Sequence, residues 1–78
     1  MNTHWEPTTL VHNTDTGQTV TADVTQFTPE QRLTVNLQGI DINLQYNTQH
    51  QEYQGSRAGR EFVSQGPRYY TVKQGRAR

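Results

Sequence analysis

The clearest structural signal in the chain is the stretch LTVNLQGIDINLQY, which runs from Leu33 to Tyr46. Apolar residues recur there at every second position, and this spacing is typical of strands with one buried face. The phase of the alternation slips by one position between Leu37 and Ile40. The slip needs a structural explanation, because a single regular strand would keep one phase throughout.

A two-residue turn at Gln38-Gly39 explains the slip, since it places Leu37 directly opposite Ile40 in a β-hairpin. A glycine bulge within one long strand is the alternative explanation. The hairpin directs six apolar side chains toward the core: Leu33, Val35, Leu37, Ile40, Ile42 and Leu44.

Weaker alternation on both sides of this hairpin predicts further strands. Residues 19–25 form a one-sided strand whose apolar side chains are Val20, Ala22 and Val24, and the turn-rich residues 13–17 join it to a strand over residues 8–12. Residues 28–31 (Thr-Pro-Glu-Gln) predict one helical turn or a type I turn. Downstream, we expect short strands over residues 51–54, 60–64 and 68–74, separated by glycine-containing loops at 55–59 and 66–67. In the last strand, Tyr70 and Val72 are expected to face the core, and Tyr69, Thr71 and Lys73 the solvent.

Six or seven short sequential strands predict an all-β, mostly antiparallel meander that closes into a rolled sheet or a small SH3-like or OB-like barrel. At most one helical turn, near residues 28–32, fits the pattern. We expect residues 1–73 to form a single domain and residues 74–78 a mobile basic tail.

The composition indicates a thin core. Apolar residues make up 29% of the 78, and there is no cysteine to form disulfides or thiolate metal sites. Small domains with such cores gain support from association, so we expect a homo-oligomer with Trp5 or the C-terminal tyrosines at the contact. No segment resembles a signal peptide or an apolar membrane span, so a cytoplasmic protein with no membrane partner is expected.

The residues that carry catalytic chemistry do not form recognisable motifs. Ser56 and Ser64 lie in no nucleophile motif, and the three histidines lack metal-ligand spacing. The glycines at positions 55 and 59 lack the spacing of a phosphate-binding loop. We therefore expect a protein that is not an enzyme and that carries no cofactor or metal.

Charge is strongly segregated along the chain. Residues 1–52 contain six acidic residues and one arginine, whereas residues 53–78 contain six basic residues and one glutamate. Tyrosines are interleaved with these bases, and arginine and tyrosine are common both in nucleic-acid interfaces and in protein interfaces. The candidate binding surface consists of Arg57, Arg60, Arg68, Tyr69 and Lys73.

Two functional hypotheses follow. The leading one is a non-enzymatic interaction or structural module that associates with itself or with a partner protein through a β edge or an aromatic and arginine-rich surface. Threonine, glutamine and asparagine supply 27 of the 78 residues, which suits an accessory subunit of a large assembly such as a phage particle. The alternative is a small barrel that binds single-stranded nucleic acid through its C-terminal half. In the leading hypothesis, the bases instead neutralise neighbouring acidic strands or lie at a subunit contact.

Overall fold

The chain folds into eight β-strands in a computed structural model, which describes residues 2–72. The strands are β1 (Asn2–Trp5), β2 (Thr8–Asn13), β3 (Thr19–Thr28), β4 (Arg32–Leu37), β5 (Ile40–Asn47), β6 (Glu52–Arg57), β7 (Arg60–Ser64) and β8 (Tyr69–Val72). Across these residues there is no helix that could cross a membrane. The expected tail at residues 74–78 and the side chain of Lys73 lie outside the described part of the chain.

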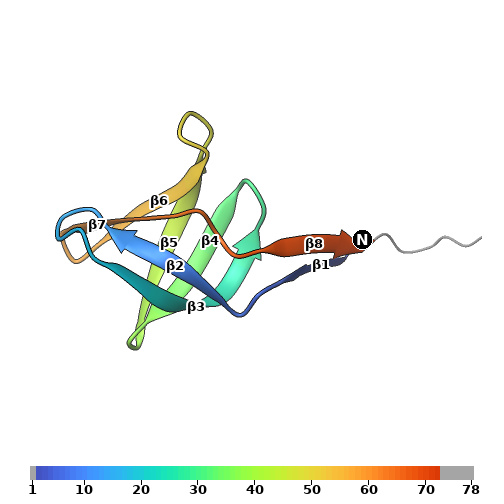
Figure 1. The fold of residues 1–78 in the computed structure, drawn as a ribbon, viewed down its shortest axis with the longest axis horizontal. Helices are drawn as coiled ribbons and strands as arrows, with labels where there is room; N and C mark the ends of the chain where they lie inside the picture. The colour runs from blue at the N-terminus through green and yellow to red at the C-terminus, as the bar shows by residue number, and fades with distance from the viewer. Residues whose placement is uncertain (1, 73–78) are drawn as a thin grey trace, which may run out of the picture.

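Strands β2 to β7 form a closed antiparallel barrel in which each strand pairs with its neighbours in sequence (Figure 1). The order is that of an up-and-down meander, because every connection is a short hairpin and the barrel closes by pairing β7 with β2. This confirms the predicted all-β fold and small barrel. Strands β1 and β8 are not part of the barrel and pair only with each other among the described residues.

The predicted central hairpin is present with the predicted register. Leu37 lies opposite Ile40 and Val35 opposite Ile42. Both turn residues have positive φ, 52° at Gln38 and 86° at Gly39, which is the pattern of a type I′ turn. The Asn36 carboxamide oxygen accepts a hydrogen bond from the Gly39 N–H at 3.0 Å. This bond stabilises the turn, although Gln stands at the position where Asn is more common.

The turn at residues 28–31 differs from its prediction. The Gln31 N–H bonds to the Thr28 carbonyl at 3.0 Å, so the segment is a β-turn and not a helical turn. Glu30 has φ of 59°, and a positive φ at the third position belongs to a type II turn rather than type I.

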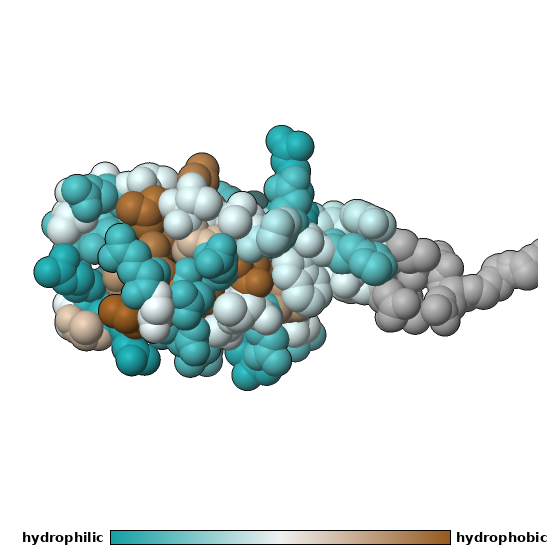
Figure 2. Space-filling view, turned by 90° about the horizontal axis from the view of Figure 1, so that it is seen from below, coloured by the Kyte–Doolittle hydropathy of each residue, from teal (hydrophilic) through white to brown (hydrophobic). Residues whose placement is uncertain are grey.

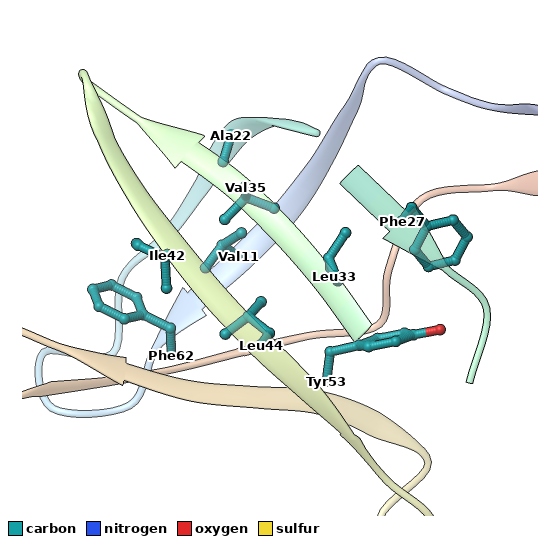
Figure 3. Packing of buried hydrophobic residues seen from close by; sticks show 9 residues of the cluster. All are labelled: Val11, Ala22, Phe27, Leu33, Val35, Ile42, Leu44, Tyr53 and Phe62. Carbon is teal, nitrogen blue, oxygen red and sulfur yellow. The ribbon is translucent and has the colours of Figure 1, made fainter. Parts of the chain in front are cut away.

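Every barrel strand contributes to one apolar core (Figure 3). Aliphatic side chains fill its middle, with Phe62 toward one end and Phe27 and Tyr53 toward the other. The buried apolar side chains are Val11, Ala22, Phe27, Leu33, Val35, Ile42, Leu44, Tyr53 and Phe62. The buried residues alternate along β4 and β5, whereas in β3 the register shift between Val24 and Gln26 brings both Ala22 and Phe27 to the core side.

The core is smaller than the sequence predicts. Ile40 is 48% exposed and Leu37 is half-buried, although both were expected inside. They lie next to the Gln38-Gly39 turn, where the hairpin reaches the end of the barrel and has no strand above it. Val20 and Val24 are half-buried too, and β3 shifts register directly after Val24, between Val24 and Gln26.

A glycine inside β6 lets two strands approach closely. The segment from residue 55 to 59 was predicted as a loop, but β6 continues to Arg57 and only Ala58 and Gly59 form the turn. A Cβ at Gly55 would collide with the Asn43 carbonyl and lie 2.8 Å from the Leu44 Cδ2. Gly55 is therefore needed for contact with β5 and not for a positive φ.

The barrel closes at a seam that combines backbone pairing with one hydroxyl. Only two residues of β2 pair with β7: His12 with Val63 and Asn13 with Phe62. Further along the seam, the buried Ser64 hydroxyl donates to the Leu10 carbonyl at 2.7 Å. The same oxygen accepts the Gly66 N–H at 3.0 Å. Ser64 thus satisfies polar groups where strand pairing has stopped.

Candidate functional site

Strands β1 and β8 form a two-stranded ribbon that extends away from the barrel (Figure 1). His4 lies opposite Tyr70 and Trp5 opposite Tyr69. Because directly opposed residues of an antiparallel pair point to the same side, the ribbon has a Trp5/Tyr69 face and a His4/Tyr70 face. The outer edge of each strand carries no strand partner within residues 2–72.

The two faces have different surroundings. Trp5 and Tyr69 each contact the buried Phe27 edge-on, with ring centroids 5.9 and 5.2 Å apart. On the opposite face, His4 and Tyr70 stack with their ring centroids 5.2 Å apart. Tyr70 is 63% exposed, against 46% for Tyr69 and 36% for Trp5. One face of the ribbon therefore rests on the barrel, and the other presents an aromatic pair to solvent.

The prediction for this strand was wrong about Tyr70. Tyr70 was expected in the core and Tyr69 on the solvent side, yet Tyr69 is the residue that contacts the barrel. The physical reason is that β8 leaves the barrel after Gly66 and pairs with β1, so its alternation no longer refers to the barrel core. The side chain of Val72, which was expected beside Tyr70, lies outside what the structure describes.

The ribbon is attached to the barrel by aromatic packing and backbone bonds. Phe27 contacts Tyr53 with ring centroids 5.7 Å apart, so the aromatic contacts continue from the ribbon into the core. At the base, the Glu6 N–H bonds to the Arg68 carbonyl at 3.0 Å, and the Val24 N–H to the Pro7 carbonyl at 2.7 Å. Burial raises the pKa of the Tyr53 phenol, although its hydroxyl accepts the Glu30 N–H at 2.8 Å.

The predicted binding residues fall into two separate groups. Arg57 and Arg60 lie directly opposite each other beside the β6–β7 turn. Arg68 and Tyr69 lie at the base of the ribbon, where they line a different hollow together with Trp5. Lys73 lies outside the described residues. The basic half of the sequence thus does not form one continuous stripe in residues 53–72.

The strand register also bears on the neutralisation hypothesis. Within the described strand pairs, no arginine lies directly opposite an acidic residue: Arg57 opposes Arg60, and Arg32 opposes Thr28 and Gln45. Arg57 instead donates from Nη1 to the backbone carbonyl of Asp41 at 3.3 Å. Cross-strand neutralisation of acids by bases is therefore not supported by this register.

The histidines have separate surroundings. His12 Nδ1 lies 2.9 Å from the Thr19 hydroxyl, whereas His4 stacks on Tyr70 and His50 lies in the turn before β6. Across residues 2–72, no three side chains of histidine, aspartate or glutamate gather in a way that could hold a metal ion.

Comparison of the chain with protein-family models, with curated proteins and with solved structures found no match.

Proposed function

We propose that this protein is a non-enzymatic interaction module whose docking element is the β1–β8 ribbon and whose partner is a second copy of the same chain. In this proposal the ribbon extends across a two-fold axis into a larger antiparallel sheet. The module would serve as a small subunit of a larger assembly.

The observation that carries the proposal is the ribbon's combination of open edges and exposed aromatic rings. A two-stranded ribbon is marginally stable in water, and an open edge offers unpaired N–H and C=O groups to another strand. Trp5, Tyr69 and Tyr70 are all at least 36% exposed. Aromatic residues of this kind are enriched in protein interfaces and in their energetic centres.

The charges favour a copy of the same chain as the partner. Neither described ribbon strand contains an acidic residue, a lysine, an arginine or a proline, the usual devices that keep natural edges apart. The net charge of the chain is zero, so two copies do not repel each other as a whole. Antiparallel pairing of an edge with itself is also the geometry that a two-fold axis produces.

Nucleic-acid binding remains the second candidate, and its support is local. Arg68 lines one hollow at the ribbon base together with Trp5, Tyr69 and Tyr70, and the acidic Glu6 lines it as well. This arrangement resembles a small platform on which bases stack, with one arginine to bind a phosphate. The other two arginines of the predicted surface, Arg57 and Arg60, line a separate hollow beside the β6–β7 turn and do not contribute to this one.

The test is sedimentation equilibrium of the full chain at micromolar concentration, with two variants matched for exposure. Tyr70→Lys places a charge on the ribbon, where Tyr70 is 63% exposed. Leu10→Lys places the same charge on the barrel wall, where Leu10 is 61% exposed. We expect a dimer mass for the wild type and for Leu10→Lys, and a monomer mass for Tyr70→Lys.

A strictly monomeric wild type would overturn the proposal, and so would dissociation caused by Leu10→Lys but not by Tyr70→Lys. Titration of the same samples with oligothymidylate separates the second candidate. Tight binding to a monomer that weakens steeply with salt would favour the nucleic-acid function instead.

A further inference from the structure

A small apolar hollow lies at the end of the barrel opposite the ribbon. It has a volume of about 180 Å³ and lies between the β4–β5 turn and the β6–β7 turn. Its apolar lining comes from Leu37, Ile40, Ile42 and Phe62. Pockets for drug-sized ligands and cofactors measure about 300–1,000 Å³, so this hollow has the size for a single side chain.

Part of this apolar surface is exposed to solvent. Ile40 is 48% exposed, although the hairpin register would allow a polar residue next to the turn. Figure 2 shows apolar surface at this end of the molecule, surrounded by hydrophilic side chains. An apolar floor with a polar rim is the usual arrangement of a docking hot spot.

Two arginines line the same hollow. Arg57 and Arg60 are directly opposed across the two-residue turn formed by Ala58 and Gly59. Like charges directly opposite each other on a sheet are destabilising, and an anion between them would relieve the repulsion. Arg57 is also held by its 3.3 Å bond to the Asp41 carbonyl, which restricts where its guanidinium can lie.

We infer that this hollow is a second docking site, independent of the ribbon, which takes an acidic-apolar peptide segment from a partner protein. An apolar side chain of the peptide fills the hollow, and carboxylates beside it pair with Arg57 and Arg60. Charge complementarity supports this occupant, because arginine binds carboxylates in bidentate geometry and both arginines line the hollow.

The test is an amide chemical-shift titration of the full-length protein with the peptide acetyl-Asp-Leu-Asp-amide. We expect the amides of residues 38–40 and 57–60 to shift, and the ribbon amides to stay in place. The uncharged peptide acetyl-Asn-Leu-Asn-amide should bind about tenfold more weakly, because two partly exposed ion pairs are lost. The peptide acetyl-Asp-Ala-Asp-amide should also bind more weakly, because it leaves the hollow unfilled.

The protein variant Arg57→Gln/Arg60→Gln should remove the preference for the acidic peptide, whereas the control variant Arg32→Gln should keep it. Equal binding of the acidic and amide peptides by the wild type would overturn the inference without any variant. Shifts confined to the ribbon, or no shifts at millimolar peptide, would overturn it too. None of these readouts depends on whether the ribbon forms a dimer.

Discussion

The β4–β5 hairpin and the β1–β8 ribbon are both antiparallel strand pairs, but only one of them encloses a core. The hairpin has six opposed residue pairs, and one face carries Leu33, Val35, Ile42 and Leu44 into the barrel. The ribbon has four opposed pairs and exposes aromatic rings on both faces. Alternating sequence forms strands in both places, whereas burial depends on whether other strands cover the face.

The two regions are also stabilised by different interactions. Burial of a large aliphatic side chain contributes about 1.5–3 kcal/mol, so the hairpin carries a large share of the fold's stability. The ribbon depends on Phe27 and on two backbone bonds at its base. Substitutions in the hairpin should therefore unfold the protein, and substitutions in the ribbon should leave it folded.

The largest expected effect is that of Ile42→Ala, which leaves a cavity beside Val35 in the core. The loss should be about 2–5 kcal/mol in the free energy of unfolding. Urea unfolding followed by tryptophan fluorescence measures it, since Trp5 packs on Phe27. A cooperative transition at almost the wild-type urea concentration would show that the hairpin does not dominate stability.

An intermediate effect is expected for Tyr53→Phe, whose ring packs in the core against Phe27, the residue on which the ribbon rests. The variant removes the hydroxyl that accepts the Glu30 N–H, at a cost of about 1 kcal/mol. The raised pKa of Tyr53 adds a pH dependence. Above pH 10 the unfolded chain loses this proton before the folded protein does, so wild-type stability should fall there.

Urea unfolding at pH 8 and at pH 11 measures both effects. The fall between the two pH values should be smaller in Tyr53→Phe than in the wild type. The control is Tyr70→Phe, which removes a hydroxyl from the most exposed of these aromatic residues and should match the wild type at pH 8. Identical pH dependence in Tyr53→Phe and wild type would contradict the role given to burial of this phenol.

The smallest effect is expected for Tyr70→Ser, measured at a protein concentration low enough to keep every sample monomeric. Tyr70 contacts only its stacking partner His4 among the described aromatic pairs, so the free energy of unfolding should change by no more than about 0.5 kcal/mol. Thermal unfolding provides the comparison. A loss as large as that of Ile42→Ala would mean that the ribbon is part of the folding core.

Most of the barrel could be predicted from the sequence because alternation and turn residues act locally. The Gln38-Gly39 turn sets the register of β4 and β5. The one-position shift in the apolar alternation beside this turn can be read directly from the sequence. The same period identified Ala22, Leu33, Val35, Ile42 and Leu44 as core residues, whereas the buried Val11 and Phe27 were not among the predicted core residues. The exceptions, such as Ile40, lie where the hairpin runs past the strands that would cover it.

The ribbon could not be predicted, because its two strands are short and lie at opposite ends of the described sequence. The Thr3 and Thr71 hydroxyls, 68 residues apart, lie 3.5 Å from each other. Four residues such as those of β1 carry too little pattern to identify a strand. Trp5 was expected at a contact because it is a large aromatic residue. That Phe27 packs against it could not be predicted, because the position of Phe27 depends on the closed barrel. The segregation of charge in the sequence likewise gave no sign that Arg57 and Arg68 would line separate hollows.

The seam at Ser64 has a consequence for the order in which the chain folds. All other barrel pairings join consecutive strands through short turns, while the Ser64–Leu10 bond closes a separation of 54 residues. Closing such a loop costs more entropy than forming any hairpin of the meander. Once β7 meets β2, however, β8 and β1 are brought together as their direct extensions. We therefore expect the ribbon to form after the barrel has closed.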